Sequence, residues 1–297
     1  MESNKLRGFT EAIVSAAAFG LIPLFSIPAL ADGMRLPSLV VYRFTFGAFI
    51  LLLILIYNRQ SLRLRFGESL RIMFLSLLYA ISAVSLISGY AYLPSGVATI
   101  LVFSYPVWTA ILMIIFFHEH LTLRTVLAIL LAVAGVCLLS GIEKGISFSS
   151  ITGIALELLS GLTYAIYMVA FPAMKVRHLS TLKVTFYVFF FTILLLVLYA
   201  SFTEGGIQPI ISNKQFVNLA LLGLLPTAVS NITLIMALKR IESTTVAILG
   251  AFEPITAMSV GCIVFGEPLT IMSCIGFALI IVAVILLILK KTSYTNE

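Results

Sequence analysis

Ten long apolar runs dominate this sequence, and only short polar links separate them. A helix of roughly 20 apolar residues is long enough to cross the hydrocarbon core of a bilayer. Lipid offers no hydrogen bonds to the backbone, so each crossing segment must satisfy its own polar groups. The pattern therefore predicts an all-α membrane protein with ten transmembrane helices. They are expected near residues 9–31, 36–57, 70–92, 95–117, 122–141, 150–172, 181–203, 215–238, 243–265 and 269–290.

The composition supports a lipid-facing surface. Hydrophobic residues make up 61% of the chain and charged residues only 10%, whereas soluble domains carry roughly 25% charged residues. A transmembrane barrel would alternate apolar and polar residues, but Phe49–Tyr57 and Phe277–Leu289 are continuously apolar. The run from Phe9 is longer than the core of a signal peptide. We therefore expect a first helix that is retained.

One segment of the chain occurs twice, 148 residues apart. In each copy a proline is followed thirteen positions later by a glutamate, and then by a Leu-Thr pair. The copies are Pro106, Glu119, Leu121 and Thr122, and Pro254, Glu267, Leu269 and Thr270. A doubled unit in a membrane chain is typical of transporters whose site lies between the two halves. We therefore predict two repeats of five helices each, residues 1–148 and 149–297.

The distribution of charge predicts how these repeats lie in the membrane. Most of the 18 lysine and arginine residues fall in links on the side of the N-terminus, whereas Arg35, Lys144 and Lys214 fall on the other side. The positive-inside rule then places both termini in the cytoplasm. Because five is an odd number, the second repeat enters the membrane from the opposite side, which makes the repeats inverted. A weaker match at the repeat starts pairs Gly8, Ser15 and Phe19 with Gly153, Ser160 and Tyr164.

The repeated motif resembles the signature of the drug/metabolite transporter superfamily, EamA type. The first copy runs from Ser104 to Thr122 and the second from Phe252 to Thr270, and Arg43-Phe44 in the second helix also fits that family. The first copy departs from the pattern, because His118 stands where glycine is usual. The resemblance implies ten helices in inverted repeats and transport of small organic solutes. It places the protein in the cell membrane, the inner membrane of a bacterium, as a multi-pass protein.

Arg43 is the most expensive residue to place within the membrane. An arginine at this depth costs about 2.5 kcal/mol or more, so it should face the protein interior and have a partner. Glu157 lies at a matching depth in the sixth helix, which predicts that the two form an ion pair or share a polar network. Arg43 could hold this partner statically, or it could bind a substrate carboxylate or phosphate through two hydrogen bonds.

Polar stripes at helical spacing indicate further cavity walls. In the sixth helix Glu157, Ser160 and Tyr164 are spaced three and four apart, so they share one face. Tyr79 and Ser82 mark a similar face in the third helix, although serines at such spacing are also common between close-packed helices. In the eighth helix Asn231 follows Pro226 by about one turn, and an amide at this depth needs hydrogen bonds.

The prolines of the repeated motif fall near the middle of the membrane, where substrate sites of inverted-repeat transporters are expected. Glu253 precedes Pro254, and Tyr105 precedes Pro106 at the equivalent position. Trp108 lies one turn further and could stack on a planar substrate or simply pack. The predicted substrate-binding residues are Arg43, Tyr79, Ser82, Tyr105, Trp108, Glu157, Ser160, Tyr164, Asn231 and Glu253.

Other chemistry finds little support in the sequence. Glu119 and Glu267 lie in short turns before helices and are predicted to cap them structurally, since carboxylates suit helix N-termini. His118 and His120 are expected in solvent, and Cys137, Cys262 and Cys274 have no metal-ligand spacing. No metal, cofactor or nucleic-acid site is predicted. The intramembrane serines have no histidine to activate them, so an enzyme is not expected.

The sequence therefore favours a secondary transporter, an exporter of amino acids or related amphipathic metabolites, that works by alternating access around a midplane cavity. Nucleosides, S-adenosylmethionine-like cofactors and cationic drugs are the alternative substrates, and a channel is the alternative class. The absence of a phosphate-binding Gly-rich motif points to a gradient as the energy source. Glu157 and Glu253 are the candidate residues for coupling to protons. Ten helices in one chain make a monomer sufficient, with a dimer as the alternative.

Overall fold

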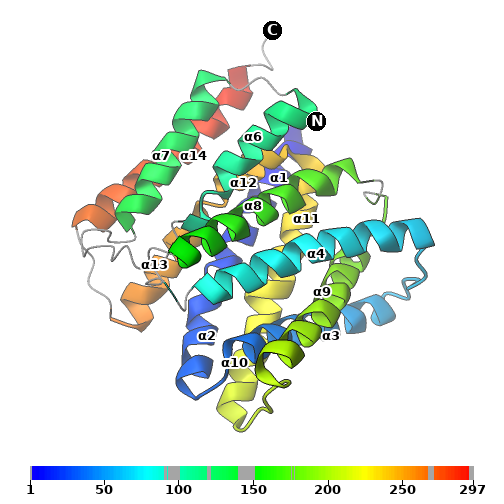
Figure 1. Cartoon of the computed structure of the whole chain (residues 1–297). Helices are drawn as coiled ribbons and strands as arrows, with labels where there is room; N and C mark the ends of the chain where they lie inside the picture. The colour runs from blue at the N-terminus through cyan, green and yellow to red at the C-terminus, as the bar shows by residue number, and fades with distance from the viewer. Residues whose placement is uncertain are drawn as a thin grey trace.

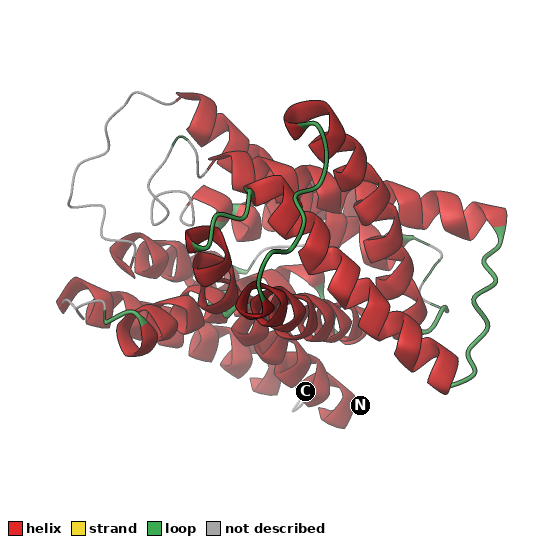
Figure 2. Cartoon of the chain, turned by 90° about the horizontal axis from the view of Figure 1, so that it is seen from below, coloured by secondary structure: helices red, strands yellow, loops and turns green. Residues whose placement is uncertain are grey.

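The computed structural model describes residues 2–89, 92, 101–118, 122–139, 151–174, 176, 178–266 and 271–293 (Figure 1). Over these residues the regular structure is helical and contains no strand (Figure 2), which confirms the all-α prediction. The helices are α1 (Glu2–Phe19), α2 (Ile22–Ala31), α3 (Leu36–Tyr57), α4 (Phe66–Gly89), α6 (Tyr105–Phe117), α7 (Leu123–Leu139), α8 (Ile151–Ala173), α9 (Thr181–Glu204), α10 (Asn213–Gly223), the π-helical segment η2 (Leu224–Val229), α11 (Ser230–Arg240), α12 (Ser243–Leu249), α13 (Phe252–Val264) and α14 (Ile271–Ser293).

The described residues include seven helical stretches that are long and apolar enough to cross a membrane. These are Asn4–Ala31, Leu36–Tyr57, Phe66–Leu86, Ile151–Ala173, Thr181–Glu204, Asn213–Arg240 and Ser243–Val264. Three shorter apolar helices accompany them, at Tyr105–Phe117, Leu123–Gly135 and Cys274–Ala283. The fold is therefore that of a protein with several membrane spans.

The repeated proline motif interrupts a helix in both of its copies. Proline has no N–H and its ring clashes with the carbonyl four residues earlier, so a helix weakens there. The two turn residues 103–104 directly precede α6, which carries Pro106, and the turn at 250–251 precedes α13, which carries Pro254. The backbone bonds at these breaks span three residues instead of four, as from Glu253 N to the Gly250 carbonyl at 2.9 Å. The duplicated sequence thus produces the same local structure twice.

Helices pack in pairs that link distant parts of the chain. α4 packs on α8, α1 on α11, α3 on α9 and α7 on α14. α7 and α14 lie side by side at one edge of the molecule (Figure 1). α6 also packs on α8, and α13 also packs on α1. Each contact therefore joins an element of the N-terminal half to one of the C-terminal half.

In two of these helix pairs, a serine on one helix bonds the backbone carbonyl of a serine on the other. Between α4 and α8, Ser82 Oγ donates to the Ser160 carbonyl at 3.1 Å and Ser160 Oγ donates to the Ser82 carbonyl at 2.9 Å. Between α1 and α11, Ser15 Oγ donates to the Ser230 carbonyl at 2.8 Å, with the two hydroxyl oxygens 3.4 Å apart. Small residues of this kind let membrane helices approach closely and bond across the interface.

Gly20, at the break between α1 and α2, allows α13 to approach closely. A Cβ atom at this position would collide with the Glu253 carbonyl oxygen and lie 2.7 Å from Thr256 Cβ. The nearest obstacle is backbone, which cannot turn aside as a flexible side chain can. This contact sets the distance between α1 and α13 at the position of Glu253.

We predict that Gly20→Ala destabilises the protein, because the added methyl group overpacks a backbone contact at a typical cost of about 1–3 kcal/mol. Thermal unfolding in detergent measures the effect as a lower melting temperature. Gly67→Ala is the matched control, since a Cβ there meets nothing within 4 Å and alanine favours the helix by up to about 1 kcal/mol. Equal melting temperatures for the two variants would contradict the close packing of α1 on α13.

Candidate functional site

A cavity of about 180 Å³ reaches into the bundle beside the link between α2 and α3. We call this end of the bundle, with residues 32–35, the mouth end, and the opposite end, with the α3–α4 link at residues 58–65, the far end. Aromatic and aliphatic side chains make most of the cavity wall. The lining residues are Phe19, Gly20, Ile22, Pro23, Ser26, Leu30, Leu36, Leu39, Val40, Arg43, Phe44, Tyr79, Ser82, Ala83, Leu86, Val102, Phe103, Tyr105, Ser160, Tyr164, Glu253, Pro254 and Ala257.

Two charged side chains of opposite sign line this cavity. Arg43 comes from α3 and is 7% exposed, and Glu253 comes from the first turn of α13 and is half-buried. Among the described residues the Glu253 carboxylate has neither a hydrogen bond nor an ion pair with a protein group. A carboxylate that lines a cavity without a protein partner can accept a positively charged or donating group from a ligand.

Arg43 is oriented by the π-helical segment of the neighbouring span. Pro226 cannot bond the Leu222 carbonyl, because proline lacks the N–H. Thr227 donates its hydroxyl proton to that carbonyl at 2.8 Å, and the same oxygen accepts a bond from Arg43 Nε at 2.7 Å. The hydroxyl has one proton and it is used on Leu222, so its lone pairs face the guanidinium. One threonine thus satisfies the proline break and fixes the cation.

Aromatic rings surround the two charges. The guanidinium carbon of Arg43 lies 5.1 Å from the centre of the Phe19 ring and 5.5 Å from that of Phe44, within the range of cation–π attraction. The rings of Tyr105 and Tyr164 meet edge to face at 5.2 Å. The centre of the Tyr79 ring lies 6.3 Å from that of Tyr164 and 5.6 Å from that of Phe44, so these rings continue the wall toward Arg43.

Most of the predicted binding residues meet in this cavity. Those that line it are Arg43, Tyr79, Ser82, Tyr105, Ser160, Tyr164 and Glu253. They come from five helices far apart in sequence, α3, α4, α6, α8 and α13, because α4 packs on α8 and both breaks at the repeated prolines turn toward the same space. Their role in binding is still a prediction, but the geometry places them around one ligand-sized space.

Asn231 lies behind the cavity wall, contrary to the expectation that it lines the cavity. Its side-chain N–H₂ donates to the Tyr79 hydroxyl at 3.0 Å and to the Thr227 carbonyl at 2.9 Å. Burial requires such bonds of an amide, and the π-helical turn supplies the carbonyl. Asn231 therefore holds Tyr79 in place and does not itself face the cavity.

Trp108 and Glu157 also lie outside the cavity lining, contrary to expectation. Trp108 turns back along its own helix, where its indole N–H donates to Ser104 Oγ at 3.1 Å. Glu157 is fully buried, and its carboxylate packs against Gly89, whose missing side chain lets α4 and α8 close together there. Among the described residues neither Glu157 oxygen is hydrogen-bonded, so the expected ion pair with Arg43 does not form.

Two further predictions concern the repeated glutamates and metal binding. Glu119 and Glu267, predicted as helix caps, lie outside the described residues. Within the part of the chain that the structure describes, no cluster of three or more His, Cys, Asp or Glu side chains could hold a metal.

Two residues of the cavity wall were not predicted from the sequence, Ser26 of α2 and Phe19 at the end of α1. The sequence signal was Pro23, which lies at the start of α2, just after the break between these two helices.

Comparison with known proteins identifies the family. The model of the EamA-like transporter family matches residues 6–141 and again residues 151–289. Two relatives from Archaeoglobus fulgidus, each named as an uncharacterized transporter, are 29% identical over 64% of this chain and 66% of the relative, and 24% identical over 68% and 71%. A solved crystal structure matches with a TM-score of 0.81 at 17% identity, covering 97% of this chain and 98% of that one. That likeness shows the shared fold.

We predict that Thr227→Val destabilises the protein by about 1–3 kcal/mol, because the Leu222 carbonyl and the Arg43 guanidinium both lose a buried partner. Melting temperature in detergent measures the effect. Thr227→Ser keeps the hydroxyl and serves as the control, with a smaller loss expected. If valine and serine variants melt alike, the hydroxyl does not hold Arg43.

Proposed function

Because this chain belongs to the EamA-like transporter family of the drug/metabolite transporter superfamily, we propose that this membrane transporter is a secondary transporter that exports small organic metabolites. The proposed substrates are amino acids or related amphipathic solutes, which bind in the cavity of Arg43 and Glu253. Transport follows alternating access, in which the cavity opens to one side of the membrane and then to the other. No enzymatic step is needed.

The proposed architecture is ten transmembrane helices in two inverted repeats, residues 1–148 and 149–297, with both termini in the cytoplasm of a bacterial cell. The family model matches each half once. The serine pair Ser82–Ser160 has a counterpart in Ser230–Ser15, whose members lie 148 and 145 positions away in the sequence. Such correspondence of contacts is what an exchange of the two halves by a pseudo-two-fold axis requires.

Some positions that line the cavity at the mouth end have counterparts in the other half that are buried at the far end. Ser26 and Leu86 line the cavity, whereas Phe171 and Leu234, at the corresponding places of the second half, are 0% and 4% exposed. A second pocket enters from the far end, between α6, α8 and the α11–α12 link, and shares no lining residue with the first. The cavity of Arg43 and Glu253 is thus separate from the far-end pocket in this state, as alternating access requires.

The pairing of one cation and one carboxylate in an aromatic cavity is the observation that carries the substrate class. A zwitterion can place its carboxylate at Arg43, with charge-assisted bonds, and its ammonium group at Glu253. Tyrosine and phenylalanine rings then bury the apolar part of the solute. We propose Glu253 also as the group that couples transport to protons, because its carboxylate lines the cavity without a hydrogen bond or ion pair to the described residues.

We predict that Arg43→Lys and Glu253→Gln each reduce L-phenylalanine flux into proteoliposomes roughly tenfold or more, since each removes a charged hydrogen bond worth about 1.5–3 kcal/mol. Radiolabelled L-phenylalanine, with an imposed pH gradient, measures the flux. Trp108→Phe is the matched control and should transport as the unchanged protein does. Normal transport by Arg43→Lys would contradict two-bond recognition, and flux indifferent to the pH gradient would contradict proton coupling.

A further inference from the structure

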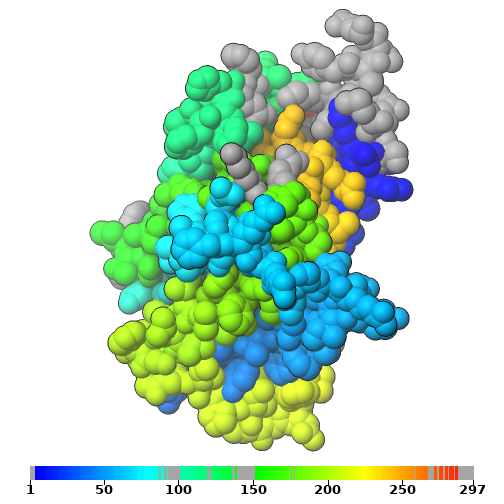
Figure 3. Space-filling view, turned by 90° about the vertical axis from the view of Figure 1, so that its right-hand side faces the viewer, coloured from blue at the N-terminus to red at the C-terminus, as the bar shows by residue number. Residues whose placement is uncertain are grey.

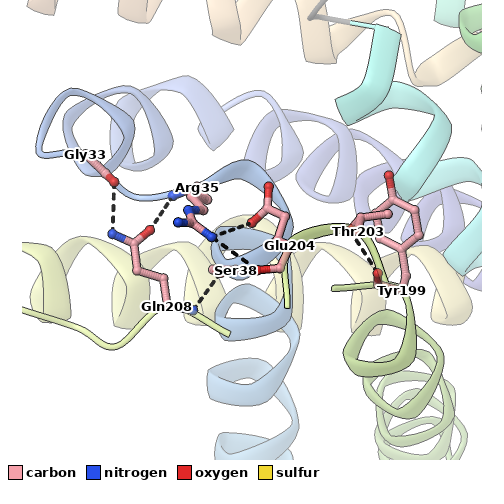
Figure 4. A network of polar contacts seen from close by, with 7 residues as sticks. All are labelled: Gly33, Arg35, Ser38, Tyr199, Thr203, Glu204 and Gln208. Atoms are coloured by element: carbon pink, nitrogen blue, oxygen red, sulfur yellow. Dashed lines mark hydrogen bonds and ion pairs between the residues drawn. The ribbon is translucent and has the colours of Figure 1, made fainter. Parts of the chain in front are cut away.

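Gln208 ties two links together at the mouth end of the bundle (Figure 4). Its side-chain oxygen accepts a bond from Arg35 N at 2.8 Å, and its side-chain nitrogen donates to the Gly33 carbonyl at 3.1 Å. Its backbone N–H donates to Ser38 Oγ at 2.9 Å, and its carbonyl accepts from the Tyr42 hydroxyl at 2.8 Å. Every polar group of this residue is thus bonded to the α2–α3 link or the start of α3. We call these four bonds the Gln208 clasp.

Charged residues lie beside the Gln208 clasp but contribute little to its stability. Arg35 lies 3.9 Å from the Glu204 carboxylate and donates to the Glu204 carbonyl at 3.3 Å, as Figure 4 shows. Lys214 and Asp32 are 3.8 Å apart. The two basic side chains are largely exposed and the two carboxylates are partly exposed, and solvent-exposed ion pairs contribute about 0–1 kcal/mol. The four hydrogen bonds of Gln208, of which those with Ser38 and Tyr42 are partly buried, therefore make most of the attachment.

A corresponding set of bonds, the Gln60 clasp, lies at the far end. The side-chain oxygen of Gln60 accepts a bond from Ser180 Oγ at 2.6 Å. The Tyr187 hydroxyl donates to the Leu62 carbonyl, and Lys183 donates to another carbonyl of the same link. The α3–α4 link thus lies against the start of α9, and the space-filling view of this side of the molecule shows the two in contact (Figure 3). One link of each half is again held by the first turns of a helix of the other half.

The members of the two clasps correspond in sequence. Gln60 and Gln208 lie 148 positions apart, the same separation as the two copies of the proline motif. Tyr42 and Tyr187 lie 145 positions apart, which is the separation of Ser15 from Ser160. Each clasp joins the start of one helix of the α3–α9 pair to the link that follows the other helix. Since α3 has 22 residues, the clasps stand about 33 Å apart.

The two glutamine clasps differ from a gate, which is a contact that opens when the cavity changes sides. In a transporter with inverted repeats the two ends exchange conformations when the cavity changes sides. A contact that works as a gate is therefore made at one end and broken at the other in any one state. The positions of Ser26 and Phe171 behave in this way, one in a cavity and the other buried. The two glutamine clasps do not, because both are formed together in the state with the cavity at the mouth end.

We propose that α3 and α9, with the Gln60 and Gln208 clasps, form one unit that stays joined through the whole transport cycle. The cavity then opens and closes by movement of the other helices against this unit. α3 presents Arg43 to the cavity from within the unit, so the backbone that carries this anion-binding group keeps its place while the access side changes. This inference rests on the proposed alternating-access function, and it adds which part of the bundle is stationary.

Chemical cross-linking tests the proposal in a background in which Cys137, Cys262 and Cys274 are replaced by alanine. Arg35→Cys with Glu204→Cys spans the mouth-end clasp, and Arg63→Cys with Lys183→Cys spans the far-end clasp, while both glutamines stay intact. The comparison pair, Leu30→Cys with Leu86→Cys, spans the cavity between α2 and α4. A bifunctional thiol reagent joins each pair, and each protein is compared before and after joining.

Two readouts separate this inference from the transport proposal. The first is L-phenylalanine flux, and the second, measured without any solute, is the rate at which a maleimide labels Leu234→Cys, which is buried at the far end in this state. We expect both joined clasps to keep flux and labelling within about twofold, and the joined comparison pair to reduce both about tenfold or more, because only the latter blocks an exchange of the two ends.

Loss of flux or labelling on joining either clasp would overturn the inference, since that clasp would then have to open. Labelling that continues while no variant moves L-phenylalanine would count against the proposed substrate alone, and the unchanged rate in the joined clasps would still support a stationary α3–α9 unit. If Leu234→Cys were labelled in none of the variants, the far end would not open. That result would overturn both the inference and alternating access.

Discussion

A proline inside a membrane helix leaves a backbone carbonyl without its usual N–H partner, and the protein must supply another from within. At Pro226 the Thr227 hydroxyl takes this place for the Leu222 carbonyl. Because its single proton is committed there, the same oxygen can only accept, and it accepts from Arg43. The solution to a backbone defect thus fixes Arg43, and the positive charge of the cavity depends on it.

The two repeated prolines apply the same constraint at equivalent positions. Each ends a helix break that turns its preceding residue toward the cavity, Tyr105 in one half and Glu253 in the other. The breaks correspond, but the residues they present do not. A frame with corresponding contacts therefore encloses a site in which the two halves differ, and that difference gives the cavity its carboxylate opposite Arg43.

Much of the fold followed from the sequence because lipid leaves few alternatives to a helix. The apolar runs predicted where helices occur, and the polar stripe of α8 correctly brought Ser160 and Tyr164 to the cavity. The failures came from contacts between helices. Glu157 shares that stripe, yet Gly89 lets α4 close over it. Asn231 was predicted in the cavity, but the π-helical turn directs its amide to Tyr79. Helix periodicity specifies a face, whereas such close approaches depend on the partner helix.

The central claim is that one cavity holds both charges of a zwitterionic solute, at Arg43 and at Glu253. Isothermal titration calorimetry of the purified protein tests it with L-phenylalanine, phenethylamine and hydrocinnamate, which share the ring but differ in charged groups. The account predicts that L-phenylalanine binds at least about tenfold more tightly than either singly charged compound, since each lacks a charged hydrogen bond worth about 1.5–3 kcal/mol. Equal affinity for all three would contradict it.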